Sequence, residues 1–206
     1  MPSVFELTGP DEVPLAAATE ALARGELVVL PTDTVYGVAA RPDLAGATAR
    51  LFEAKRRPRG LTLPVLASDL GQADDVGRFD QRARTLAGRF WPGALTLILP
   101  RGAASAAWDL GAERATVALR VPDQAVARSL LRRTGPLAAT SANLSGRPTP
   151  EECGGVREAL GDAVAVYLCS GRLSPIPSTI VDLTGSEARM VRDGAVSPEE
   201  VLAALR

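Results

Sequence analysis

The sequence predicts one α/β domain in which helices cover a twisted, mixed β-sheet. Short apolar runs such as Leu27–Leu30 and Ala94–Leu99 alternate with longer alanine-rich or amphipathic stretches along the whole chain. The composition, 46% hydrophobic and 23% charged over 206 residues, is that of a globular protein able to bury a substantial core. Because no repeat, low-complexity tract or long linker interrupts the pattern, residues 1–206 are expected to form a single domain.

The predicted elements are placed by apolar periodicity and by start and stop residues. Strands are expected at Leu27–Leu30, Leu63–Ala67, Ala94–Leu99, Ala115–Val121, Leu137–Thr140, Val164–Leu168, Thr179–Leu183 and Arg189–Arg192. Helices are expected at Pro14–Arg24, Leu44–Arg56, Asp80–Phe90, Gln124–Arg133, Pro150–Leu160 and after Ser197. Gly25 closes the first helix, and Asp43 is expected to cap the second. Ser197 and Glu200 form a capping box for the last helix.

A polar stretch, Pro31–Gly37, directly follows the apolar run Leu27–Leu30. Pro31 has no N–H to donate and so ends the strand, and the next residues are mostly hydroxyl and carboxyl side chains. Polar clusters at the end of a buried strand are where open α/β sheets bind ligands. An ordinary strand-to-loop exit with side-chain-capped turns would explain the same residues, so spacing alone leaves both interpretations open.

Two features of the composition limit the chemistry. The chain has no histidine, which excludes Ser-His-Asp and Cys-His catalysis and any histidine-ligated metal. Lys55 is the only lysine among 23 Lys and Arg residues, which leaves 22 arginines. Lysine is a compact point charge, whereas arginine is a broad planar fork. Lys55 therefore suggests a position that needs the shape of lysine, with chance retention as the alternative.

Three further stretches carry candidate chemistry. Lys55-Arg56-Arg57-Pro58-Arg59 places four cations where a helix is expected to end, more than the helix dipole needs, and suggests phosphate binding. The stretch Ala139–Gly146 supplies hydroxyl and amide groups, although a hydrogen-bonded turn would explain it equally well. Ser178-Thr179 together with Arg192-Asp193-Gly194 adds hydroxyl and guanidinium groups. Neither GxxxxGK[ST] nor GxGxxG occurs, so a nucleotide site would be of another type.

Seven short motifs occur in an order that identifies a family. They are PTDTVYG at 31–37, KRRP at 55–58, FWPGALTL at 90–97, LRVP at 119–122, SANLSG at 141–146, STIVDL at 178–183 and VRDG at 191–194. In this the chain resembles the YrdC family of threonylcarbamoyl-AMP synthases, from about Leu15 to Val196, and specifically its short, single-domain type. The resemblance implies a YrdC-like fold, a twisted α/β sheet with a large concave, positively lined cavity.

The resemblance also implies an activity, that of a nucleotidyltransferase. The family condenses L-threonine, bicarbonate and ATP into threonylcarbamoyl-AMP and releases pyrophosphate, with Mg²⁺ accompanying ATP and no metal held by the protein alone. A separate transferase complex then passes the threonylcarbamoyl group to an adenosine beside the tRNA anticodon. A transient contact with that complex, and a weak contact with tRNA, are therefore implied.

Site residues follow from matching positions in the motifs. Those that match threonine-binding positions are Thr34, Arg120, Ser178 and, more weakly, Thr140. Those that match ATP-binding positions are Lys55, Arg57, Thr116, Ser141, Asn143 and Arg192, of which Lys55 and Arg57 are also expected to be catalytic. The physical reasoning agrees for Arg120, which interrupts an apolar strand where an unpaired charge is costly. A threonine carboxylate is a fitting bidentate partner, and a buried Asp or Glu is the alternative.

Two departures and two rival functions remain. Leu61-Thr62 and Leu66 stand where many relatives have Asn-Pro and a histidine, so one ATP contact and one threonine contact are expected to be absent. An RNA-binding module of the same fold is disfavoured by the net charge of −1 and the 4% aromatic content. A domain that handles carbamoyl-adenylate without threonine, as in hydrogenase-maturation proteins, normally belongs to a much longer chain.

The sequence predicts a cytoplasmic protein. Its N-terminus has no basic or long apolar segment, and no apolar run is long enough to span a bilayer. Only Cys153 and Cys169 occur, without CxxC spacing. Reduced thiols are expected, and a single disulfide is the alternative.

Overall fold

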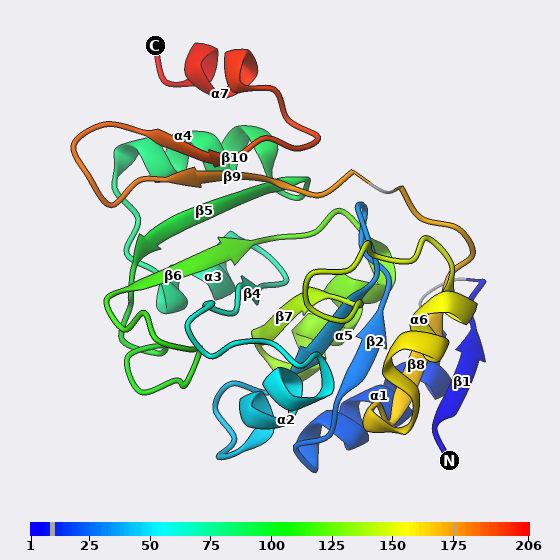
Figure 1. The fold of residues 1–206 in the computed structure, drawn as a ribbon. Helices are drawn as coiled ribbons and strands as arrows, with labels where there is room; N and C mark the ends of the chain where they lie inside the picture. The colour runs from blue at the N-terminus through cyan, green and yellow to red at the C-terminus, as the bar shows by residue number, and fades with distance from the viewer. Residues whose placement is uncertain (9–10, 175) are drawn as a thin grey trace.

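A ten-stranded mixed sheet organises the computed structural model, which describes residues 1–8, 11–174 and 176–206 (Figure 1). The strands are β1 (Ser3–Glu6), β2 (Val28–Leu30), β3 (Gly37–Ala40), β4 (Val65–Leu66), β5 (Leu95–Pro100), β6 (Thr116–Arg120), β7 (Leu137–Ser141), β8 (Val166–Cys169), β9 (Thr179–Asp182) and β10 (Arg189–Arg192). Their order across the sheet is β1-β8-β2-β3-β7-β4-β6-β5-β9-β10. Pairs β1/β8, β2/β8, β4/β6 and β5/β9 are parallel and the others antiparallel, so the predicted mixed sheet is confirmed.

Helices cover both faces of this sheet. They are α1 (Glu12–Ala23), α2 (Ala47–Ala54), α3 (Leu70–Val76), α4 (Gln81–Phe90), α5 (Ala125–Thr134), α6 (Cys153–Leu160) and α7 (Pro198–Ala204). In Figure 1, α1 and α5 lie behind the sheet, whereas α6 lies in front of β8 and α2 packs against β3. Alternate residues of β2 follow the same division: Val28 and Leu30 pack in one apolar cluster with α1 and α5, and Val29 packs in the other with α2 and α6.

The predicted strands and helices all occur, with ends shifted by a few residues. Besides a short 3₁₀-helix at Gly161–Ala163, three elements of the described chain were missed. β1 is an exposed edge strand that pairs only with β8, so it has little apolar pattern to detect. β3 consists of Gly37-Val38-Ala39-Ala40, which has low intrinsic strand propensity but is buried between β2 and β7. The third is α3, whose N-cap Asp69 accepts a hydrogen bond from the backbone N–H of Gln72.

The prediction for the second helix was wrong at its start. Asp43 does not cap a helix; it pairs with Arg41, whose Nε donates to Asp43 at 2.7 Å. The helix begins three residues later, after Gly46, which has a positive φ of 79°. Lys55 is its C-cap, so the cationic stretch follows the helix rather than forming its last turn. The capping box of α7 is present as predicted.

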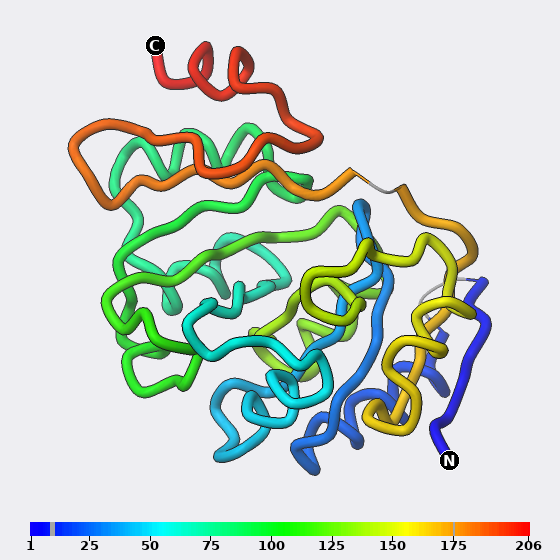
Figure 2. The backbone as a smooth tube through the Cα atoms, in the orientation of Figure 1, coloured from blue at the N-terminus to red at the C-terminus, as the bar shows by residue number. Residues whose placement is uncertain are grey.

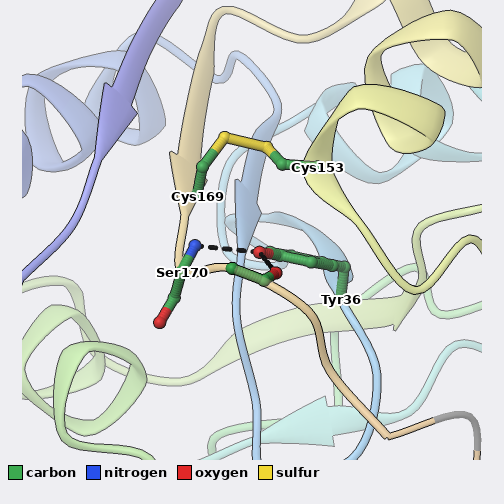
Figure 3. Close-up of a disulfide and its surroundings, with 5 residues drawn as sticks. Tyr36, Cys153, Cys169 and Ser170 are labelled. Carbon is green, nitrogen blue, oxygen red and sulfur yellow. Dashed lines mark hydrogen bonds between the residues drawn. A yellow bond between two sulfur atoms is a disulfide. The ribbon is translucent and has the colours of Figure 1, made fainter.

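Cys153 and Cys169 form a disulfide that joins the start of α6 to the end of β8 (Figure 3). The expectation of two reduced thiols is therefore wrong for this structure, and the alternative that the sequence left open holds. The two chain termini lie at opposite ends of the molecule (Figure 2). Within the described parts of the chain, no helix is long and apolar enough to cross a membrane.

Candidate active site

The PTDTVYG stretch is the connection of a β-hairpin between β2 and β3. It is not the exit of a parallel strand toward a helix. Within it, the Thr32 hydroxyl donates to Val35 O at 2.7 Å and accepts from the backbone N–H of Thr34 at 3.2 Å. Both threonines are buried. The loop is therefore held in one shape by its own hydroxyl groups, which presents Asp33 and Thr34 to the neighbouring strands.

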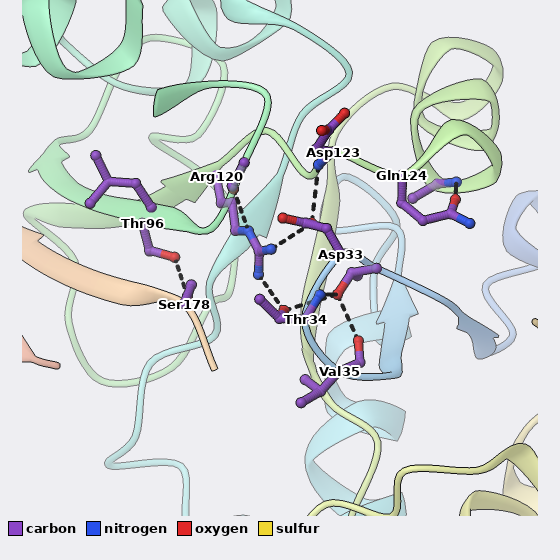
Figure 4. A network of polar contacts seen from close by, with 12 residues as sticks. Asp33, Thr34, Val35, Thr96, Arg120, Asp123, Gln124 and Ser178 are labelled. Atoms are coloured by element: carbon purple, nitrogen blue, oxygen red, sulfur yellow. Dashed lines mark hydrogen bonds and ion pairs between the residues drawn. The ribbon is translucent and has the colours of Figure 1, made fainter. Parts of the chain in front are cut away.

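Arg120, at the end of β6, is the centre of a first group of polar residues (Figure 4). Its Nη2 donates to Asp33 Oδ1 at 2.6 Å, its Nη1 to the Thr34 hydroxyl at 2.8 Å, and its Nε to Gly93 O at 2.9 Å. The side chains of Arg120 and Asp33 are 8% and 17% exposed. A partly buried aspartate thus pairs with Arg120, which is close to the alternative of a buried Asp or Glu that the sequence left open. Since a guanidinium has five N–H donors, two remain for a ligand.

Ser178 and Arg192 form the other side of this group. The Ser178 hydroxyl shares a hydrogen bond of 2.8 Å with the hydroxyl of Thr96 on β5. Arg192 donates through Nε and Nη2 to Ser178 O at 3.0 and 2.8 Å. Gly194 lies so close to this backbone that a Cβ there would be 2.4 Å from Pro177 O. Any larger residue at position 194 would therefore push the VRDG turn away from Ser178.

Both arginines lose part of their usual basicity without losing their charge. Burial lowers the pKa of Arg120, against the effect of Asp33. Burial also lowers the pKa of Arg192, and the positive charge of Arg120 adds to the effect. The buried guanidinium of Arg120 and the exposed guanidinium of Arg192 repel each other, and among the described residues Arg120 alone of the two is paired with a carboxylate, that of Asp33. Such a pair of cations favours the binding of an anion.

A second group of polar residues surrounds Lys55, which is only 1% exposed. Its ammonium donates to Ser141 O, to Asn143 O at 2.5 Å and to Asn143 Oδ1 at 3.1 Å. The carbonyl of Lys55 accepts from the backbone N–H of Ser145 at 2.9 Å. Lys55 therefore hydrogen-bonds to residues near both ends of the SANLSG turn, and all three N–H donors of its ammonium are in use.

Two opposing effects act on the protonation of Lys55. Burial, assisted by the positive charge of Arg57, lowers the pKa of Lys55 to about 7. Three oxygen acceptors favour the protonated form. Arg57 itself donates through Nη2 to Thr62 O at 3.0 Å, while its Nε is buried and has no partner among the described residues. A buried donor of this kind is costly unless a ligand satisfies it.

The structure does not join every predicted residue to these groups. Thr116 lies at the start of β6, and its carbonyl accepts from Arg101 Nε at 3.1 Å. Thr140 is half-buried and pairs with Val38 across β3 and β7. Of the cationic stretch, Arg59 pairs instead with Asp109 at 2.9 Å. The roles of Thr116 and Thr140 stay predictions.

Three residues of the site were missed by sequence reasoning. Asp33 lies inside the first motif, and Thr96 is the one hydroxyl in the apolar run Leu95–Leu99, a detectable signal. Tyr36 connects the two groups: its carbonyl accepts from Ala142 N–H at 2.8 Å, beside the SANLSG turn. No pattern in the sequence predicts that contact, because it depends on the β3/β7 register, which places Gly37 opposite Ser141.

No group of three or more potential metal ligands of the His, Cys, Asp or Glu type lies together in the described part of the chain. The donors at the site are instead cationic or hydroxyl groups, which suit phosphate and carboxylate rather than a bare metal ion. The large concave cavity implied by the resemblance stays a prediction.

Comparisons with known proteins relate the chain to one family. The Sua5/YciO/YrdC family model, described as "Telomere recombination", matches residues 20–194. A protein of Mycobacterium tuberculosis (strain H37Rv) is 42% identical over 205 residues, which is 98% of this chain and 94% of that protein. Threonylcarbamoyl-AMP synthase of Bacillus subtilis (strain 168) is 37% identical over 194 residues, 93% of this chain but 56% of its own length.

The same relation holds in three dimensions. The crystal structure of Pyrococcus abyssi Sua5 complexed with L-threonine superposes with a TM-score of 0.87 and 30% identity. The match covers this chain entirely and 60% of that structure, so the chain spans less than two thirds of the archaeal protein.

Proposed function

The chain belongs to the Sua5/YciO/YrdC family, and from that premise we propose that it is a threonylcarbamoyl-AMP synthase. The activity would be that of a nucleotidyltransferase, which joins L-threonine, bicarbonate and ATP and releases pyrophosphate. One observation carries the proposal: the buried Arg120 keeps two unused donors while it contacts the Thr34 hydroxyl, and Ser178 is drawn on the same side in Figure 4. The Sua5 structure to which the whole chain is similar was solved with L-threonine, which supports this assignment.

In the proposed threonine site, the two remaining donors of Arg120 bind the amino-acid carboxylate. The Thr34 hydroxyl already accepts from Arg120. The Ser178 hydroxyl pairs with Thr96 and accepts from Arg192 Nη2 at 3.1 Å. Thr34 keeps one acceptor site for the ligand's own hydroxyl or N–H groups, and Ser178 keeps one acceptor site when it donates to Thr96, or its O–H donor when it accepts from Thr96. Thr140 is included because its position matches the family motif.

In the proposed ATP site, cations of three separate segments neutralise the phosphates. Arg57 offers its unpaired Nε, and Arg192 has an Nη1 group that donates to none of the described residues. Lys55 supplies a positive charge and holds the turn carrying Ser141 and Asn143; it reaches a phosphate by exchanging one of its present acceptors. Thr116 is placed here by its motif position alone.

Mg²⁺ would enter the site on the phosphates of ATP, because this ion prefers phosphate and water ligands to all-protein cages. It would add charge neutralisation there. Every other contribution would come from the chain's own residues.

The proposed reaction needs no general base of histidine type. An oxygen of the threonine carbamate attacks the α-phosphorus, the bond from that phosphorus to the bridging oxygen breaks, and pyrophosphate leaves with the electron pair. Such a step is catalysed mainly by positioning and by neutralising developing charge. Lys55, Arg57 and Arg192 would do this, which makes the absence of histidine no obstacle.

The product would be consumed by a transferase that acts on tRNA, so we place the protein in the cytoplasm, with transient contact to that complex and at most weak contact to tRNA. A reducing cytosol would tend to open the Cys153–Cys169 bond. Counting free thiols in protein purified under non-reducing conditions would show which state is present.

The function is tested by incubating the protein with ATP, Mg²⁺ and bicarbonate, together with single amino acids, and measuring pyrophosphate. Release that requires threonine is the expected result. Release without any amino acid would favour a carbamoyl-adenylate-handling domain, and tRNA binding without any pyrophosphate release would favour an RNA-binding module. Either outcome would overturn the proposal.

A further inference from the structure

Asp33 is the charged residue of the site that no motif assignment uses. Its Oδ1 accepts two hydrogen bonds, from Arg120 Nη2 at 2.6 Å and from the backbone N–H of Asp123 at 3.0 Å. A carboxylate has about four acceptor positions on its two oxygens. Its Oδ2 accepts from none of the residues that the structure describes. Figure 4 shows Asp33, Thr34 and Arg120 pointing toward one another, with the Thr96–Ser178 pair beside them.

The carboxylate is therefore both fixed and unsaturated. The contacts to Arg120 and to the Asp123 backbone lock its orientation, because they come from two different directions in the chain, β6 and the connection to α5. A side chain that is 17% exposed leaves the second oxygen within reach of a small molecule. Beside it are the two donors of Arg120 that remain unused.

This pairing matches a zwitterion. A free α-amino acid carries a carboxylate and an ammonium on one carbon atom, so a group that binds it needs a cation and an anion side by side. We propose that Asp33 Oδ2 accepts a hydrogen bond from the α-ammonium of the amino acid whose carboxylate Arg120 binds. The inference rests on the proposed function for its substrate, and it makes Asp33 a residue that selects α-amino acids over simple carboxylates.

The charge balance supports this assignment. Arg120 and Arg192 together carry two positive charges, and Asp33 carries one negative charge. If nothing recognised the ammonium, this net positive charge would favour a ligand with a carboxylate and no ammonium. The acceptor also keeps a partner after the amine has become a carbamate, because the carbamate nitrogen retains one N–H.

The test is calorimetric titration with three ligands: L-threonine; 3-hydroxybutanoate, which keeps the carboxylate and the hydroxyl but lacks the ammonium; and L-threoninol, which lacks the carboxylate. Wild-type protein is expected to bind threonine at least about tenfold more tightly than 3-hydroxybutanoate. This factor corresponds to the one charge-assisted hydrogen bond that 3-hydroxybutanoate cannot make. Equal or tighter binding of 3-hydroxybutanoate would overturn the inference without any variant.

Asp33→Asn keeps the shape of the side chain and one acceptor for Arg120, but it places an NH₂ group or a neutral oxygen opposite the ammonium. Threonine and threoninol are expected to lose at least about tenfold in affinity, while 3-hydroxybutanoate keeps its affinity or gains. Asp123→Asn is the matched control, since it removes a nearby charge whose side chain accepts no hydrogen bond from the described residues. It should leave all three affinities nearly unchanged.

The outcomes separate the two proposals. Wild-type protein that binds none of the three ligands, and releases no pyrophosphate with threonine, contradicts the proposed function. Wild-type protein that binds threonine, together with an Asp33→Asn variant that loses the same factor for threonine and 3-hydroxybutanoate, contradicts only the inference. Asp33 would then merely hold Arg120 in place.

Discussion

Replacing Lys55 by methionine removes the buried ammonium and keeps a side chain of similar length. Burial lowers the pKa of Lys55 to about 7 in the folded protein, from 10.5. Between these values the unfolded chain binds more protons than the folded one, so the free energy of unfolding rises with pH. Below about pH 7 both states are protonated, and the cost of burying the charge is fully present. Integration from about pH 7 to about pH 9 gives wild-type protein a gain of about 2 kcal/mol.

The assay is urea unfolding at several pH values for wild-type protein and Lys55→Met, read as the difference between the two. That difference cancels every other titrating group. The exposed Arg50→Met is the control for a lost surface cation and should follow the wild-type curve. Parallel curves for wild-type protein and Lys55→Met would refute the reasoning. They would mean that the three oxygen acceptors of Lys55 keep it protonated throughout.

Three further predictions concern activity, binding and stability. Lys55→Ala should lower adenylate formation by roughly 10²–10³-fold, the scale of one lost transition-state donor, and Lys55→Arg should not restore it fully; near-normal turnover in folded Lys55→Ala would contradict the assignment. Arg120→Ala should weaken threonine binding at least about tenfold, and it should weaken binding of a non-hydrolysable ATP analogue much less. Arg120→Lys should show an intermediate loss of threonine affinity. An equal loss of affinity for both ligands in calorimetry would point to a collapsed strand. Replacing Cys153 and Cys169 by serine should lower the free energy of unfolding by about 3 kcal/mol, because the unfolded chain would no longer be restricted by the loop that the bond closes. Unchanged urea midpoints would mean that the bond does not form in solution.

Much of the fold could be predicted because its signals are local. The apolar runs of β5 and β6, and the capping box of α7, are visible within a few residues. β3 could not be predicted, since Gly37-Val38-Ala39-Ala40 becomes a strand only through pairing with β2 on one side and β7 on the other. Asp43 failed as a cap because Arg41, two residues away, offered its carboxylate a stronger partner.

The candidate site was likewise predictable only in its local features. Motifs could name Lys55 and Arg120, but they could not give the partners of either residue. Arg120 pairs with Asp33 across 87 residues of sequence, and Lys55 with Asn143 across 88. Contacts of that separation depend on the order of strands in the sheet, which no local pattern contains. The motifs named candidate residues, of which the structure brings Thr34, Arg120, Ser178 and Arg192 into one group and Lys55, Ser141 and Asn143 into another. The structure added which donors remain unused.

The PTDTVYG loop contacts both the Arg120 group and the Lys55 group. Its first half supplies Asp33 and Thr34 to Arg120, and its last residue before β3, Tyr36, accepts the backbone N–H of Ala142. The phenol of Tyr36 is buried, which raises its pKa and keeps it neutral.

That phenol donates to Gly171 O at 2.6 Å and accepts from Ser170 N–H at 2.8 Å, directly after the disulfide-bonded Cys169. These two hydrogen bonds therefore join the hairpin loop to the end of β8, and the disulfide joins β8 in turn to α6 (Figure 3). A hydrogen-bonded network of this kind resists small displacements of its members, so we expect Tyr36 to steady the loop that lies between the Arg120 group and the Lys55 group. The proposed reaction needs an amino acid and a nucleotide to be held at one fixed separation for in-line attack. Tyr36 joins the SANLSG turn to the loop that carries Asp33 and Thr34, so we expect its substitution to disturb that separation.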